Sequence, residues 1–257
     1  MYTTQKWINL VAFILMVAVN VLANVLPLGG NTSGQVSDLH PTLFTPAGMT
    51  FSIWGAIYIL LGIVIVWSLF DKSKAGNDIV NSVGMWFAIS CALNIVWIFS
   101  WHYREYNLSM LIIAVLAMVL YVIMNKVRTN ALASSAIGLY TGWITVATIA
   151  AIYVTAAANG WNAMSGTASL LIGVGIIAGA AIIAGIVYLT GNNMFAAAAV
   201  WAYVGIIVRH TTTLSNHHPV LITLAIVGVI IIGFSSIYSM ILNGSIALVR
   251  TGNVLLR

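Results

Sequence analysis

Long apolar runs constrain the fold of this chain more than any other feature of its sequence. Of its 257 residues, 61% are hydrophobic and only 5% are charged, whereas about a quarter of an average soluble domain is charged. So few charges cannot cover a water-facing surface, which excludes a soluble globule, a disordered chain and a nucleic-acid-binding protein. Since about 20 apolar residues cross a bilayer as a helix, the sequence predicts an all-α integral membrane protein.

Eight runs are long and apolar enough to be spans. The first is longer than the apolar core of a signal peptide, and no cleavage pattern follows it, so we expect it to stay as a helix. The seventh run is the shortest. The predicted spans are 7–26, 48–70, 80–101, 107–127, 132–157, 167–190, 193–209 and 220–243.

The positive charges predict the orientation. With the N-terminus inside, the inner segments hold Lys6, Lys72, Lys74, Lys126, Arg128, Arg250 and Arg257. The outer segments hold only Arg104 and Arg209, together with all five histidines. The positive-inside rule therefore predicts cytoplasmic N- and C-termini, and we expect a multi-pass protein of a bacterial cytoplasmic (inner) membrane. The middle of each span lacks ionisable residues, which disfavours a proton relay or ion-coupled transport.

Aromatic residues recur at helical spacing on three of the predicted spans. Helical spacing places each stripe on one face of its helix. The stripes are Phe51, Trp54 and Tyr58; Asn94, Trp97 and Trp101; and Tyr140, Trp143 and Ala147. They indicate either aromatic packing between helices or a flat cavity that stacks against a planar polycyclic ligand. We assign Trp7, Trp101 and Trp161, which fall near span ends, to an interfacial belt.

The longest connection, residues 27–47, joins the first two spans on the outer side. It contains glycines and prolines and shows no apolar period. Long loops of this kind often serve as lids or binding loops, so we expect this one to cover a site.

Three motifs resemble the TspO/MBR family, the tryptophan-rich sensory proteins related to the translocator protein. The run 45–54, which reads TPAGMTFSIW, resembles the second helix of that family. Leu93 and Asn94, followed by Trp97, resemble its third helix, and Tyr140, Trp143, Ala147 and Thr148 resemble its fifth. Typical members end after five helices. The chain thus resembles a divergent, C-terminally extended member, with a TspO-like five-helix bundle in 1–157 and an additional three-helix region in 158–257.

The resemblance implies a membrane receptor or carrier for a planar hydrophobic ligand, with a sensory, scavenging or transport role. Family ligands include porphyrins, haem and sterols, so porphyrin or haem enters as a candidate ligand, and no resident cofactor is assigned. The motifs and stripes together predict these ligand-binding residues: Pro46, Phe51, Trp54, Tyr58, Asn94, Trp97, Tyr140, Trp143 and Ala147.

Charged and histidine side chains at the outer rim are candidates for binding the polar edge of such a ligand. Arg104 and Arg209 could pair with carboxylates through bidentate hydrogen bonds, although terminal arginines also anchor spans in the headgroup layer. The candidate axial ligands for haem iron are His40, His102, His210 and His217. The outer histidines lack the spacing of a metal site, and no metal is assigned.

Two other functional classes stay open. The sequence has no nucleophile–base motif and no P-loop, and we expect Cys91 to be an inert core thiol. We therefore do not expect an enzyme, although a porphyrin-modifying activity stays open as an alternative. A secondary transporter of a small hydrophobic metabolite is the main alternative, despite the lack of an internal repeat. The expected partners are membrane lipids, a small hydrophobic ligand and a second copy of the chain, but no nucleic acid.

Overall fold

The computed structural model describes residues 2–26, 28–71, 74–214 and 218–242, and this part of the chain contains helices and loops but no strands. Eight segments within it are long and apolar enough to cross a membrane, which confirms the eight predicted spans. The spanning helices are α1 (Tyr2–Val25), α3 (Ile53–Phe70), α4 (Lys74–His102), α5 (Tyr106–Lys126), α6 (Ala131–Ala158), α7 (Gly166–Thr190), α8 (Asn193–Val208) and α9 (Pro219–Leu242).

Residues at the ends of the apolar runs set where these helices begin. The side chains of Asn130, Ser165 and Asn192 accept hydrogen bonds from the third backbone N–H of α6, α7 and α8, and proline starts α9. Gly191 ends α7 in a left-handed conformation. The short seventh run is lengthened by a π-helical segment, η3 (Arg209–Thr213), so that α8 and η3 together form a complete span of 21 residues.

Helix α4 begins before the predicted residue 80 and bends near its start. Gly84 has φ 50° and ψ −137°, a conformation that only glycine adopts readily. The side-chain amide of Gln5 on α1 donates to the Gly84 carbonyl at 2.9 Å, which satisfies a carbonyl at the bend. The sequence did not predict this bend, because a glycine inside an apolar run is equally typical of close helix packing.

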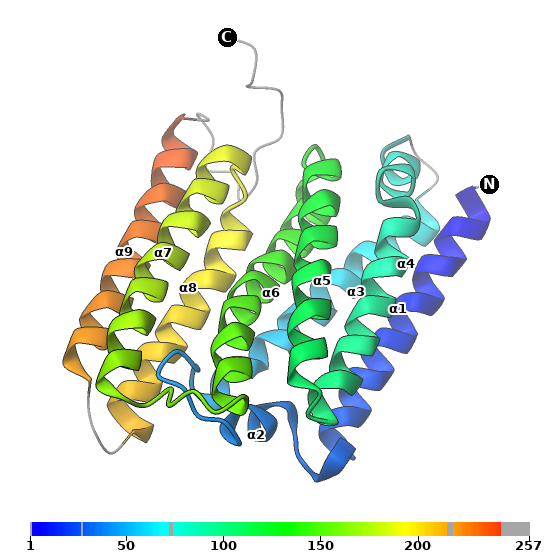
Figure 1. Cartoon of the computed structure of the whole chain (residues 1–257). Coiled ribbons are helices and arrows are strands. Elements are labelled where there is room, and N and C mark those ends of the chain that lie inside the picture. The colour runs from blue at the N-terminus through cyan, green and yellow to red at the C-terminus, as the bar shows by residue number, and fades with distance from the viewer. Residues whose placement is uncertain (1, 27, 72–73, 215–217, 243–257) are drawn as a thin grey trace.

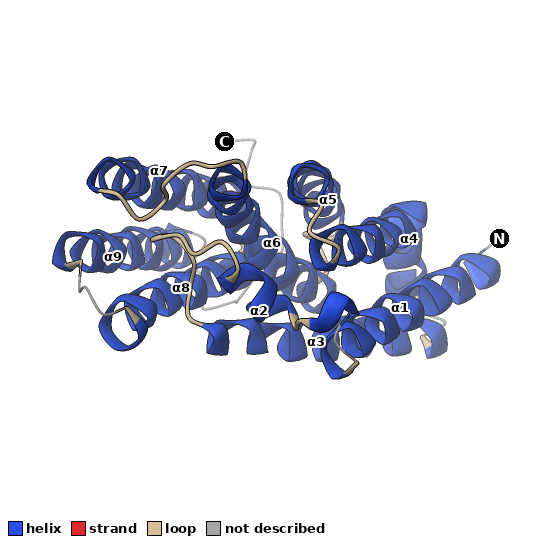
Figure 2. Cartoon of the chain, turned by 60° about the horizontal axis from the view of Figure 1, so that its bottom comes forward, coloured by secondary structure: helices blue, strands red, loops and turns tan. Residues whose placement is uncertain are grey.

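Helix α6 lies at the centre of the molecule (Figures 1 and 2) and is the most buried of the spans. It packs against α3 and α5 on one side and against α7 and α8 on the other. Gly138 and Gly142 of α6 face Asn192 and Phe195 at the start of α8, so small residues allow the two backbones to approach closely. The proposed division at residue 157 falls at the end of α6, and a separation into two domains stays a prediction.

The segment between α1 and α3 closes one end of the bundle (Figure 1). Residues 31–52, which we name the lid, contain the short helix α2 (Ser33–Asp38) and the 3-10 helix η2 (Gly48–Ser52). A shorter 3-10 turn, η1 (Leu28–Gly30), precedes the lid. The start of α1 and the end of α9 lie at the opposite end. The two helix ends thus share a side, and the cytoplasmic location of that side stays a prediction.

Candidate ligand site beneath the lid

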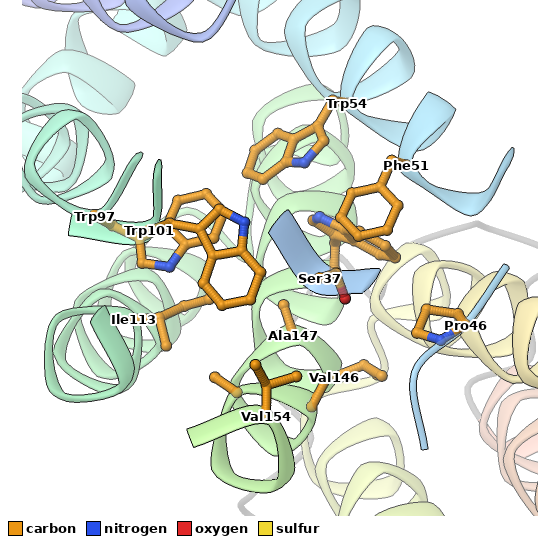
Figure 3. A pocket seen from close by; sticks show the side chains of 13 residues that line it. Ser37, Pro46, Phe51, Trp54, Trp97, Trp101, Ile113, Val146, Ala147 and Val154 are labelled. Carbon is orange, nitrogen blue, oxygen red and sulfur yellow. The ribbon is translucent and has the colours of Figure 1, made fainter. Parts of the chain in front are cut away.

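A cavity lies beneath the lid, between the first turns of α3 and the facing sides of α4, α5 and α6. Figure 3 shows Trp54 and Phe51 on one side of it and Trp97 and Trp101 on another. Its lining comprises Ser37, Pro46, Phe51, Trp54, Trp97, Trp101, Ile113, Trp143, Val146, Ala147, Ala150, Ala151 and Val154. These side chains are apolar apart from one hydroxyl and the indole N–H groups, and none of them is charged.

Trp54 is the hub of the aromatic rings around the cavity. Its ring centroid lies 6.1 Å from that of Trp97 and 6.4 Å from that of Trp143. Trp97 stacks in turn on Trp101 at 6.4 Å, with an interplanar angle of 21°, and Phe51 meets Trp143 edge-on at 5.8 Å. Offset and edge-on pairs are the geometries that aromatic rings prefer, so the rings hold one another in place around the cavity.

Two buried indole N–H groups in this lining have no hydrogen-bond partner. Trp97 and Trp143 are only 6% and 3% exposed, and the Nε1 atom of each is buried and unpaired. The neighbouring Trp101, by contrast, donates its N–H to the Ser33 carbonyl of the lid at 3.1 Å. Since a buried donor without an acceptor costs free energy, these two donors are the feature of the cavity that most calls for an explanation.

The cavity is contracted. Its volume is about 50 Å³, whereas sites for drug-sized ligands measure roughly 300–1,000 Å³. A planar polycyclic molecule can therefore enter only if the lid or the aromatic rings shift. The lid supplies Ser37, Pro46 and Phe51 to the lining, so its movement would enlarge the cavity directly.

The structure brings six of the nine predicted ligand-binding residues to this cavity. They are Pro46, Phe51, Trp54, Trp97, Trp143 and Ala147. The lining residues that were not predicted include Trp101, which shares a stripe with Trp97 but was assigned to the interfacial belt, and Ser37 of the lid. The spacing of Trp101, four residues after Trp97 on the same helix face, was the signal that could have identified it.

The other three predicted residues lie next to the cavity but do not line it. Tyr58 stacks on Trp54 with a centroid distance of 5.5 Å. Asn94 and Tyr140 are fully buried and belong to a polar network with Asn20 of α1. Asn20 donates to the Asn94 side-chain oxygen at 2.6 Å, and Asn94 donates to the Tyr140 hydroxyl at 2.8 Å. The structure thus shows the Asn94 amide joining α1, α4 and α6.

Five of the six predicted rim residues belong to the described part of the chain; these five lie outside the lining, and most have other contacts. Arg104 is exposed in the turn after α4, and Arg209 forms an ion pair with Asp38 at 2.9 Å. His102 and His210 are buried, with ring nitrogens 2.8 Å from the carbonyls of Ile98 and Leu43. His40 packs edge-on against Tyr106, and His217 lies outside the described residues.

Within the described ranges, no three His, Cys, Asp or Glu side chains come together as the ligands of a metal ion would. The single cysteine, Cys91, is buried in the helical core.

Comparison with known proteins gives one match. The family model described as "TSPO-like protein" matches residues 6–238, which include nearly all of the helices from α1 to α9. No curated protein and no solved structure matches the chain.

Proposed function

The chain belongs to the TSPO-like protein family, and from this we propose that it is a membrane receptor or carrier for a planar, mostly apolar ligand of the porphyrin, haem or sterol class. A multi-pass membrane location follows from the family and from the eight apolar helices. The bacterial cytoplasmic membrane and a sensory, scavenging or transport role are parts of the proposal.

The unpaired indoles of Trp97 and Trp143 carry the proposal. A ligand that stacks on Trp54 and presents an oxygen or nitrogen acceptor would satisfy donors that the protein itself leaves unpaired. Hydrogen bonds made in an apolar cavity are strong because no water competes for the donors. The preferred ligand is therefore amphipathic, with a flat apolar body and at least one acceptor, rather than a plain hydrocarbon.

A porphyrin meets these requirements more fully than a sterol. Its planar ring offers a large π surface to the indoles, and each of its carboxylates is an acceptor. The cavity lining has no charge, so only one carboxylate, hydrogen-bonded to the indole N–H groups, would lie inside the cavity, and the other would stay at the rim. Arg104 is the exposed cation there, while Arg209 would first have to exchange Asp38 for the ligand carboxylate.

Titration of the purified protein with protoporphyrin IX, haemin and cholesterol tests this proposal. Trp143→Phe keeps an aromatic ring but removes one of the two donors. We expect it to weaken protoporphyrin IX binding about five- to tenfold, as the loss of one buried hydrogen bond does. Trp86→Phe is the matched control, because Trp86 is 41% exposed on α4 and lies outside the lining.

Three results are informative. Saturable, stoichiometric binding that only the Trp143 variant weakens supports the proposal, and a Soret shift specific to haemin that is lost with one rim histidine would add axial ligation. Equal affinity of both variants would contradict the assignment of the site. Absence of saturable binding by all three compounds would contradict the ligand class and favour a transporter of a smaller hydrophobic metabolite.

A further inference from the structure

Helix α8 and its continuation η3 contact the lid along most of its length. These contacts join segments more than 150 residues apart in the sequence, and they comprise one backbone–backbone hydrogen bond, two contacts of side chains with backbone carbonyls and one ion pair. The contacting pairs are Trp201 with Thr50, Gly205 with Ala47, Arg209 with Asp38, and His210 with Leu43.

Two of these contacts fix the backbone of the lid next to the cavity. The Trp201 indole donates to the Thr50 carbonyl at 2.8 Å, and the Ala47 N–H donates to the Gly205 carbonyl at 2.9 Å. A side chain at Gly205 would collide with Thr50 and Pro46, so the glycine allows the lid to lie directly on α8. Pro46, directly before Ala47, lines the cavity.

The other two contacts hold the outer part of the lid. The Arg209 guanidinium lies 2.9 Å from the Asp38 carboxylate, and the two side chains are 10% and 50% exposed. A partly buried pair of this kind is less screened by salt than a fully exposed one. His210 Nε2 lies 2.8 Å from the Leu43 carbonyl. Asp38 directly follows Ser37, which lines the cavity.

The start of the lid is fixed separately. The Ser33 N–H donates to the side-chain oxygen of Asn24 on α1 at 3.1 Å, and the Ser33 carbonyl accepts from the Trp101 indole on α4. Hydrogen bonds therefore tie the lid at its start to α1 and α4, and further along to α8 and η3, while ring contacts also join it to α5 and α6. Loss of the second set would remove the polar contacts that hold the part with the lining residues, while the first set stays intact.

We propose that α8 and η3 form a latch for the lid, in which Trp201 and Arg209 are positioning residues that set how readily the cavity opens. The contracted cavity must enlarge to admit a polycyclic ligand, and the latch contacts are those that an opening of the lid would break. The identity of what enters rests on the proposed function, whereas the opening of the lid is a property of the protein alone.

Labelling of a cysteine introduced at Ser37 measures that opening without any ligand. Ser37 is a buried residue of α2 itself, so a maleimide reaches Ser37→Cys only when the lid opens. The parent protein reports any background from Cys91. Added to Ser37→Cys, Trp201→Phe removes the N–H of the latch and keeps an aromatic ring, and Asp38→Asn removes the charge of a half-exposed lid residue. We expect each change to raise the labelling rate about five- to tenfold, as loss of one such contact shifts an open–closed equilibrium.

Tyr203→Phe on the same helix is the matched control. Its hydroxyl donates to the Ile176 carbonyl of α7 at 2.6 Å and does not contact the lid, so we expect the labelling rate to stay at the parent value. Unchanged labelling in the Trp201 and Asp38 variants would overturn the latch. An equal increase in the Tyr203 variant would also overturn it, because opening would then reflect general loosening of α8. Failure of every porphyrin titration would contradict only the proposed function.

Discussion

Replacement of Asn94 by alanine separates a structural role of this amide from a ligand-binding one. Its aromatic stripe and the family motif both assign Asn94 to the ligand. In the structure its side chain instead bonds to Asn20 and Tyr140, and it does not line the cavity. We therefore expect Asn94→Ala to destabilise the protein while leaving the ligand affinity of the folded fraction within about twofold.

The size of this destabilisation follows from the hydrogen bonds that an alanine cannot form. Two buried hydrogen bonds disappear, and such bonds within membrane bundles contribute about 0.6 kcal/mol on average and up to about 1.7 kcal/mol. Asn20 keeps its bond to the Met16 carbonyl at 2.9 Å, but the Tyr140 hydroxyl is left without its amide donor. The truncation also leaves a small cavity in a fully buried position. Together these effects lower the free energy of unfolding by about 2–4 kcal/mol.

Reversible unfolding in mixed micelles measures this destabilisation, and a double-mutant cycle with Tyr140→Phe isolates the contact between the two side chains. We expect a coupling energy of about 0.6–1.7 kcal/mol. Protoporphyrin IX affinity is measured on the same samples. Unaltered stability together with a large loss of affinity would refute the reasoning, because Asn94 would then contact the ligand.

Three further substitutions test the packing of the helices, each by thermal or denaturant unfolding. Gly142→Ala places a methyl group against the α8 backbone and should lower the free energy of unfolding by about 1–3 kcal/mol. The control Gly185→Ala meets open space and should not destabilise the protein. Equal effects of the two changes would contradict the close approach of α6 and α8. Gly84→Ala forces alanine into a positive-φ conformation and should lower the free energy of unfolding by about 1–3 kcal/mol. The control Gly55→Ala should not do so. A neutral result for Gly84→Ala would contradict the bend in α4. Tyr203→Phe removes a hydrogen bond to a backbone carbonyl of α7 and should cost about 1 kcal/mol; no change would show that this bond contributes nothing.

The spans were predictable because their determinants are local. An apolar run of sufficient length and a capping residue at its start are both visible in the sequence, as Asn130 and Ser165 show. The bend at Gly84 was not predictable, because it depends on a side chain from another helix. Gln5 of α1 donates a hydrogen bond to the carbonyl at the bend, and the sequence around Gly84 does not indicate that partner.

The candidate site was predictable in part for the same reason. A stripe fixes which residues share a helix face, and that placed Trp54, Trp97 and Trp143 around one cavity. It does not fix which neighbour each residue meets. Asn94 shares a face with Trp97, yet its amide meets Asn20 of α1, and the stripe cannot distinguish this partner from a ligand.

The contribution of α8 lay beyond the reach of the sequence analysis. Trp201 and Thr50 are 151 residues apart, and no local pattern connects them. The C-terminal helices read only as an extension of unassigned purpose. Their contact with the lid becomes visible once Gly138 and Gly142 place α8 beside α6.

Determination of the structure of the protein with protoporphyrin IX bound shows where the ligand lies. We expect planar density beneath a displaced lid, in contact with Trp54 and within hydrogen-bond distance of the Trp97 or Trp143 indole nitrogen. Density only in the apolar groove between α7 and α9, which Leu170, Val174 and Leu224 help to line, with the aromatic cavity still contracted, would contradict the proposed site.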